Sequence, residues 1–282
     1  MRRLLLLVLT SFLLSGTAVV AGVTASPAVA ATQTICSSQA VPAGWVVTRV
    51  ATGGACGSYY TFTIETPYAG IAMCNVTNAP TPTWVVVRVF ESLNCRAGTQ
   101  YWLAYELRTP ASGIAMCNVH AAPTPTFVVT RVFSSTNCRV STASWLAYEL
   151  RPPTSGIAMC SVHAVPFPTY VVTRVFTSLN CSANGANWYT FELRPPAQNL
   201  VMCNVTNAPL PAYVVVRVST STSCNAGGAS WYAYTLQQPI NDIWFCGVHA
   251  APAGWTIVQT VTTSSSCQTS TASWAAHRIR RI

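Results

Sequence analysis

AMCNVTNAPTPTWVVVRVFESLNC, residues Ala72 to Cys95, recurs as AMCNVHAAPTPTFVVTRVFSSTNC, residues Ala115 to Cys138, and similar copies follow along the chain. Each copy has a cysteine near its start and one at its end, two prolines between them and an arginine inside a valine-rich run. From Cys74 onward, every second cysteine lies 43 residues further along. Such a fixed period is typical of repeat proteins. It predicts six units, at residues 32–71, 72–114, 115–157, 158–200, 201–243 and 244–282.

Each unit contains three short extended segments separated by Pro-rich and Ser/Asn/Gly-rich turns. In unit 2 they span about residues 70–76, 84–90 and 101–108. β-branched and aromatic residues dominate them and no helical period is present, which favours strands. Two-residue alternation places Val85, Val87 and Val89 on one face of the middle segment.

The predicted fold class is therefore all-β, a tandem array of six disulfide-stapled β repeats of about 43 residues each. Two alternatives stay open at this point. Six units also suit a six-bladed, propeller-like ring, and two groups of three units suit a double β-trefoil.

The cysteines form an even set of twelve, which predicts six disulfides and no free thiol. Two pairing schemes are equally regular. One pairs cysteines within units, and the other shifts the phase, so that Cys56 meets Cys74 and Cys36 closes a ring with Cys267. We favour pairing within units, because it does not require the two ends of the chain to meet. The pairs are then Cys36 with Cys56, Cys74 with Cys95, Cys117 with Cys138, Cys160 with Cys181, Cys203 with Cys224, and Cys246 with Cys267.

The N-terminal residues predict export from the cell. Arg2 and Arg3 precede an apolar run at residues 4–14, and the small-residue sequence Ala-Val-Ala occupies residues 28–30. This pattern is typical of a signal peptide over residues 1–30, followed by one six-repeat domain over residues 31–282. We expect a secreted, extracellular protein without a membrane span in its mature chain, which suits its many cysteines. The 15 basic residues are all arginine, and complete absence of lysine indicates a GC-rich bacterial genome.

Arginine and glutamate recur at a fixed offset in the middle units. Arg88 and Glu106 lie on adjacent segments of unit 2, and the two following units repeat the offset. A partly buried arginine without a carboxylate partner would be costly. We therefore predict cross-strand ion pairs between Arg88 and Glu106, Arg131 and Glu149, and Arg174 and Glu192.

A second set of arginines has no predicted acid beside it. Arg108, Arg151 and Arg194 end the third segment of three successive units. If the units stack in register, these side chains form a basic line that suits anionic polymers such as cell-wall phosphates or uronic acids. Five tryptophans, Trp102, Trp145, Trp188, Trp231 and Trp274, also keep the period and suit stacking on sugar rings. Because each begins a strand, core packing is the favoured interpretation.

No catalytic residue, metal ligand or cofactor is predicted. His120, His163 and His249 each lie three residues after the first cysteine of a unit, and Asp242 is the only aspartate. A metal site or a proton relay needs histidines that converge with acids, so loop histidines are the favoured interpretation. No nucleophile elbow and no phosphate-binding glycine loop occurs.

The two end units carry a resemblance to known repeats. Cys36 is followed by Pro42 and then by Gly-Trp-Val at residues 44–46, with Cys-Gly at 56–57 and Phe-Thr-Ile at 62–64. This pattern resembles cysteine-paired repeats of uncharacterised secreted bacterial proteins and covers the whole mature chain. The resemblance implies no activity and adds no site residues.

Composition and motifs together favour a non-enzymatic, secreted binding protein for cell-surface or extracellular polymers. The expected partners are anionic or polysaccharide surface polymers, with no specific nucleic acid. A structural or surface-coat protein that assembles through valine-rich edges is one alternative. A secreted hydrolase that uses Asp242 and His249 is another.

Overall fold

The computed structural model describes residues 31–282, so the predicted signal peptide lies outside the described residues. The described chain is all-β, and each predicted unit holds one three-stranded antiparallel sheet. No helix among residues 31–282 has the length and apolar character needed to cross a membrane. The predicted array of six disulfide-stapled β repeats is thus confirmed.

The strands follow the same order in every unit. Unit 1 contains β1 (Thr32–Cys36), β2 (Val46–Thr52) and β3 (Tyr60–Glu65), and unit 2 contains β4 (Ala72–Cys74), β5 (Val85–Ala97) and β6 (Gln100–Arg108). Unit 3 contains β7 (Ala115–Cys117), β8 (Val128–Val140) and β9 (Ala143–Arg151), and unit 4 contains β10 (Ala158–Cys160), β11 (Val171–Ala183) and β12 (Ala186–Arg194). Unit 5 contains β13 (Val201–Cys203), β14 (Val214–Ala226) and β15 (Ala229–Gln237), and unit 6 contains β16 (Trp244–Cys246), β17 (Trp255–Val261) and β18 (Ala276–Arg281). Single 3-10 turns lie at Gly54–Cys56 and Ser265–Cys267.

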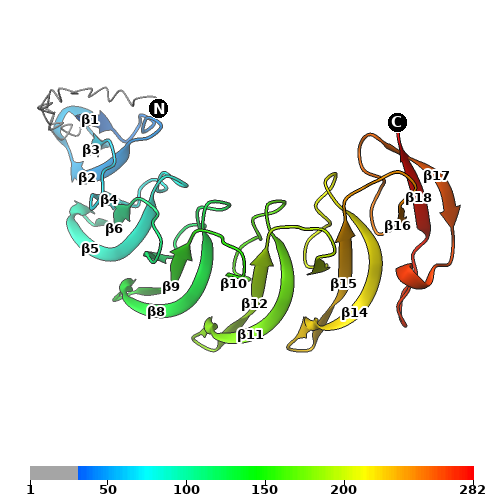
Figure 1. Ribbon diagram of the computed structural model, residues 1–282. Coiled ribbons are helices and arrows are strands. Elements are labelled where there is room, and N and C mark those ends of the chain that lie inside the picture. The colour runs from blue at the N-terminus through cyan, green and yellow to red at the C-terminus, as the bar shows by residue number, and fades with distance from the viewer. Residues whose placement is uncertain (1–30) are drawn as a thin grey trace, which may run out of the picture.

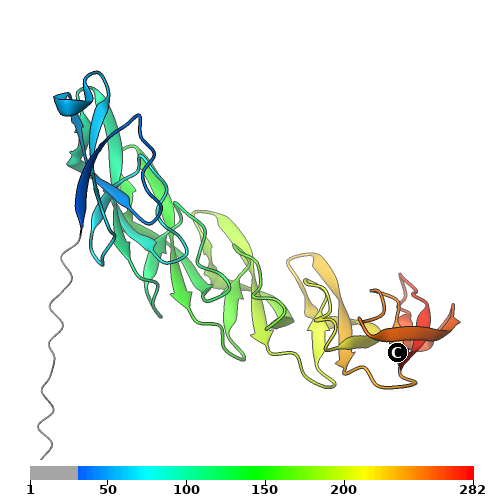
Figure 2. The ribbon, with the colours of Figure 1, turned by 90° about the horizontal axis from the view of Figure 1, so that it is seen from above.

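The third strand of each unit lies at the centre of its sheet, between the short first strand and the long second strand. The six sheets stack one behind another in an open, curved row with the two chain ends far apart (Figures 1 and 2). The alternatives of a closed ring and of a double β-trefoil are therefore wrong. Cys36 bonds to Cys56 and not to Cys267, so no covalent link closes the array.

The hydrophobic cores lie between neighbouring sheets. Val86 and Leu107 of unit 2 pack against Cys117, Cys138 and Ala147 of unit 3. The same faces meet at the other four junctions. Each core is thus built from two units, as in other repeat proteins whose units cannot bury a face alone.

A β-bulge in the long strand changes which valines face the core. In β5 the pairing register with β6 shifts between Val86 and Arg88. The extra residue rotates the strand, so Val86, 1% exposed, joins Val89 in the core, while Val87 is only half-buried. Simple alternation correctly groups Val87 with Val85, since both contact the same core, but it is wrong in placing Val89 with them.

All twelve cysteines form disulfides within their own units, and the shifted pairing scheme does not occur. In the inner units the bridged sulfurs lie inside the cores between sheets. Cys117 is 0% and Cys138 is 1% exposed. Six disulfides without a free cysteine indicate folding in an oxidising compartment.

The outer face of unit 6 has no following sheet and is more polar than the inner faces. Thr260 and His277 lie where unit 2 has Val89 and Tyr105, and their side chains share a 2.9 Å hydrogen bond. Ile257, which corresponds to the buried Val86, is 43% exposed. This face behaves as the polar cap that ends a repeat array.

Candidate polyanion-binding face

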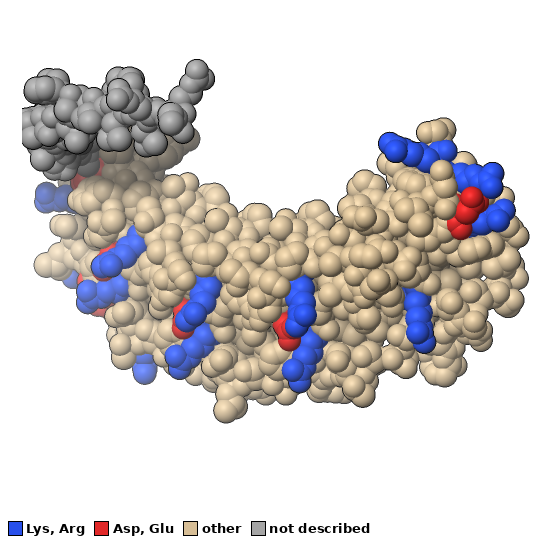
Figure 3. Space-filling view, in the orientation of Figure 1, with Lys and Arg blue, Asp and Glu red and all other residues tan. Residues whose placement is uncertain are grey.

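Five arginines stand at the same register in five consecutive sheets: Arg49 on the shorter strand β2 of unit 1, and one on the long second strand of each of units 2 to 5. The long strands β5, β8, β11 and β14 lie side by side in the stack. Each carries one exposed arginine immediately after its bulge. Stacked sheets lie about 10 Å apart, so these guanidiniums repeat at roughly that interval. We call Arg88, Arg131, Arg174 and Arg217 the arginine row; Figure 3 shows arginines spaced in this way along one face of the molecule.

Aromatic rings hold three members of the row in place. The guanidinium carbon of Arg88 lies 5.1 Å from the centroid of the Phe90 ring, two residues along the strand. The matching distances to Phe133 and Phe176 are 5.1 Å and 5.2 Å. A ring attracts the flat face of a guanidinium and leaves its N–H edges available. These arginines are therefore positioned before any ligand arrives.

The predicted cross-strand ion pairs are wrong in their partners. Glu106 does lie opposite Arg88 in the register, but its Oε1 accepts hydrogen bonds from Nε and Nη2 of Arg108, at 3.3 and 3.1 Å. Arg108 lies two residues from Glu106 on the same strand face, while Arg88 rests over Phe90 beside the bulge. In place of Arg131–Glu149 and Arg174–Glu192, the structure has Arg151–Glu149 at 2.8 Å and Arg194–Glu192 at 2.9 Å.

The two sets of arginines have thus exchanged the roles predicted for them. Arg108, Arg151 and Arg194, expected to lack an acid, each bind a glutamate and remain 57%, 55% and 53% exposed. Each of units 2, 3 and 4 now presents two guanidiniums and one carboxylate on this face. The net result is one uncompensated positive charge per unit, as the paired blue and red groups of Figure 3 illustrate.

In unit 5 the row arginine has no acid opposite it, whereas unit 6 groups two arginines around an aspartate. Arg217 lies opposite Thr235, which brings no negative charge. In unit 6, Arg278 and Arg280 lie 3.8 and 2.9 Å from Asp242. The aspartate considered for catalysis is therefore shared by two arginines, and the structure does not bring it together with His249.

The remaining candidates serve packing. The tryptophans pack against the cores between sheets, and three form edge-to-face pairs with a tyrosine of the preceding unit. The ring centroids of Tyr60 and Trp102, for example, lie 5.5 Å apart. Glu65 and Glu91 accept hydrogen bonds from Thr48 at 2.8 Å and Ser141 at 2.6 Å. Within residues 31–282, no group of three or more potential metal ligands comes together.

Three histidines lie at junctions between units. Nε2 of His120 accepts a hydrogen bond from the backbone N–H of Ala79 in the preceding unit, at 3.5 Å, and its ring meets Tyr105 edge to face. His163 accepts the matching hydrogen bond from the backbone N–H of Ala122 at 3.4 Å, and His249 accepts one from a different position, the backbone N–H of Val215, at 3.3 Å. Burial lowers the pKa of all three histidines below the ordinary value of 6.5. None forms an ion pair with a carboxylate in the described chain.

Stability is therefore expected to fall in acid. Below the ordinary pKa of 6.5 the unfolded chain binds protons at these histidines that the folded chain resists. Their contribution is complete above pH 6.5 and declines as the pH falls toward the lowered values. Urea unfolding at a series of pH values between about 5 and 8 measures the slope.

A triple substitution supplies the control for this pH dependence. Units 2 and 5 carry Thr77 and Thr206 at the histidine position, so threonine is accommodated there. In the variant His120→Thr, His163→Thr, His249→Thr, the free energy of unfolding should depend less on pH below 6.5. An unchanged slope would assign the acid sensitivity to other groups.

The phenylalanines of the face were missed by sequence reasoning, although a signal was present. Arginine followed two residues later by phenylalanine occurs in three successive units, and such a spacing places both side chains on one strand face.

Comparison of the chain with protein-family models, with curated proteins and with solved structures finds no match. The function is therefore argued from the geometry of the face.

Proposed function

We propose that the protein is a non-enzymatic, secreted protein that binds anionic polymers at the cell surface or in the extracellular medium. The observation that carries this proposal is the arginine row, with one uncompensated guanidinium per unit at a constant register. A polymer with regularly spaced anionic groups can contact several of these side chains at once. Once one contact forms, the others become intramolecular, and weak single contacts add up to useful affinity.

The chemistry of the row suits carboxylates and phosphates. A guanidinium offers planar, paired N–H donors that match the two oxygens of either group. Stacking of Arg88, Arg131 and Arg174 on phenylalanines reduces the side-chain entropy that binding would cost. Polyuronates and phosphodiester-linked wall polymers are therefore the favoured ligand classes.

Secretion is part of the proposal. The signal-peptide pattern of residues 1–30 and the six disulfides support it together, because both features suit an exported, oxidised protein. Residues 31–282 contain 13 arginines against 6 acidic residues, and this excess favours attraction to negatively charged surfaces.

The test is a fourfold substitution of the arginine row by glutamine. Exposed charge contacts contribute about 0.5 to 1 kcal/mol each. Removing four should weaken binding to polygalacturonate or poly(glycerol phosphate) by roughly 30- to 700-fold, and should flatten its dependence on salt. Fluorescence anisotropy with labelled polymers at low salt, followed by a salt titration, measures both quantities.

A matched control removes the same charge elsewhere. The variant Arg96→Gln, Arg139→Gln, Arg280→Gln, Arg281→Gln lowers the net charge equally and leaves the row intact. It should retain most of the affinity, and neutral dextran should not bind either protein through the row. Equal losses in the two variants would show that only total charge matters and would refute a site.

A further inference from the structure

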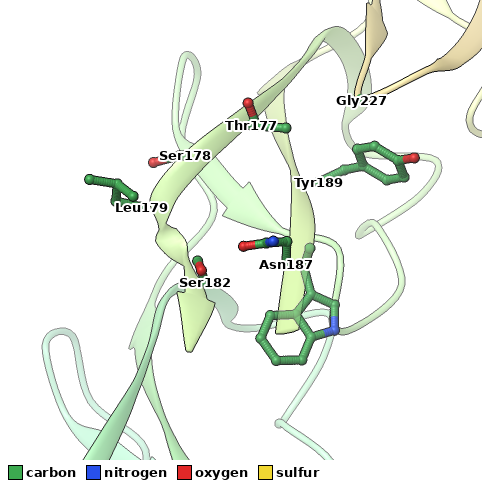
Figure 4. A pocket seen from close by; sticks show the side chains of 8 residues that line it. Thr177, Ser178, Leu179, Ser182, Asn187, Tyr189 and Gly227 are labelled. Carbon is green, nitrogen blue, oxygen red and sulfur yellow. The ribbon is translucent and has the colours of Figure 1, made fainter. Parts of the chain in front are cut away.

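A hollow opens in unit 4 where two paired strands separate. Thr177 of β11 pairs with Tyr189 of β12, and Ser182 pairs with Asn187, so four residues of β11 lie opposite Trp188 alone. The hollow has a volume of about 600 Å³ and lies within the size range of small-molecule sites. Figure 4 shows Asn187 in the opening between the strands, with Thr177 and Ser182 along its edge.

The lining mixes polar and apolar side chains and carries no ionised group. It combines the amide of Asn187 and the hydroxyls of Thr177, Ser178 and Ser182 with the half-buried indole of Trp188. An amide and hydroxyls can both donate and accept hydrogen bonds, as the hydroxyls of a sugar do. An indole offers an apolar surface for the C–H face of a sugar ring. An uncharged, polyhydroxylated ring therefore matches this lining.

Equivalent positions at two other junctions are bridged by hydrogen bonds between units. Glu91 of unit 2 accepts a hydrogen bond from Ser141 at 2.6 Å, and Ser134 of unit 3 donates to Asn184 at 2.7 Å. In unit 4, Thr177 occupies the position of Glu91 and Ser134. In unit 5, Gly227 occupies the position of Ser141 and Asn184, and it has no side chain that could form the hydrogen bond. The bridge is therefore missing at the junction that holds the hollow.

Two sequence differences keep the hollow open. A Cβ atom added at Gly227 would lie 3.4 Å from Cε1 of Tyr189 and 3.9 Å from Cγ2 of Thr177, on the wall of the hollow. In addition, unit 4 has the short Ser182 where units 2 and 3 have Arg96 and Arg139. Ser182 of unit 4 and Gly227 of unit 5 are thus both small where a longer side chain would narrow the opening.

We infer that this hollow is a binding site for one uncharged hexose ring, held by the Asn187 amide and the surrounding hydroxyls against Trp188. The site goes beyond the proposed function, because it needs no anionic group and no guanidinium lines it. It would let the protein bind a neutral glycan, or a neutral residue within a mixed polymer.

The experiment follows the indole N–H signal of Trp188 by NMR at high salt, where contacts with the arginine row are screened. The probes are methyl glucoside, methyl galactoside, methyl mannoside and N-acetylglucosamine. The Trp188 signal is identified by its loss in a Trp188→Phe variant. At least one probe should shift this signal saturably, with an affinity that does not depend on salt.

Two variants close the hollow with residues that the same fold already accommodates. Gly227→Asn places in unit 5 the residue found at Asn184, whose φ of 51° is close to the 54° of Gly227. Ser182→Arg places in unit 4 the residue found in units 2 and 3. Each should weaken sugar binding by about 10-fold or more, a loss of about 1.4 kcal/mol. The matched control is Gly98→Asn, the same turn position in unit 2 with a φ of 59°.

Normal affinity in Gly98→Asn and in the arginine-row variant, with weak binding in the two closing variants, supports the site. The site is refuted if no probe shifts the Trp188 signal saturably, or if the closing variants bind as tightly as the parent. Because the probes are neutral and the salt is high, these outcomes are independent of whether the arginine row binds a polyanion.

Discussion

Replacing Cys117 and Cys138 together by alanine is expected to lower the free energy of unfolding by about 3 to 5 kcal/mol. The disulfide joins residues 21 apart, and breaking it restores chain entropy to the unfolded state. Both sulfurs are also buried against Val86 and Leu107 of the preceding unit, so their removal loosens a core shared by two sheets. Guanidinium unfolding followed by tryptophan fluorescence measures the change.

The end unit provides the comparison. Cys36 and Cys56 span nearly the same length of chain, 20 residues, but Cys36 is only half-buried and no sheet precedes unit 1 in the described chain. Their double alanine variant should lose the entropic contribution of about 3 kcal/mol or less. A loss as large as that at Cys117 and Cys138 would contradict the role of the sulfurs in packing between units.

Leu150→Ala is the second large expected effect, at about 3 to 5 kcal/mol. Leu150 is completely buried at the junction of units 3 and 4, where it contributes to a core with Cys160 and Cys181. The substitution leaves a cavity between two sheets. Closing this cavity would require the sheets of both units to move, because the core around Leu150 contains residues of units 3 and 4. Chemical unfolding of the purified variant gives the value.

Ile257→Ala is the matched control on the polar end face. Ile257 is 43% exposed, and no sheet covers this face within residues 31–282, so its truncation should cost less than about 1 kcal/mol. Similar costs at Leu150 and Ile257 would show that the stability of the array does not depend on the cores between sheets.

The repeat, the strands and the disulfide framework could be predicted because they depend on spacing along one chain. The 43-residue period sets the units, and each unit carries two cysteines, such as Cys74 and Cys95 in unit 2. The open shape could not be read in this way, since a ring and a row have the same period. It depends on how sheets stack, and a small rotation per unit is not encoded in residue spacing.

The candidate site was harder to predict, for two physical reasons. Alternation correctly places Glu106 opposite Arg88, but an extra residue in the bulge and a nearby ring decide which arginine the carboxylate binds. The hollow of unit 4 depends on Gly227, a residue of the next unit 50 positions after Thr177. Contacts between residues of different sheets can be identified only from the three-dimensional arrangement of the units.

The sharing of every core between neighbours also determines the order in which the molecule can be completed. A single unit that emerges from the ribosome lacks the neighbouring sheets that complete its hydrophobic cores. Each core is completed only when the following sheet has formed. Folding should therefore proceed from unit to unit along the nascent chain. In the described chain this process reaches unit 6, where the hydrogen-bonded side chains of Thr260 and His277 occupy positions that hold core residues in unit 2.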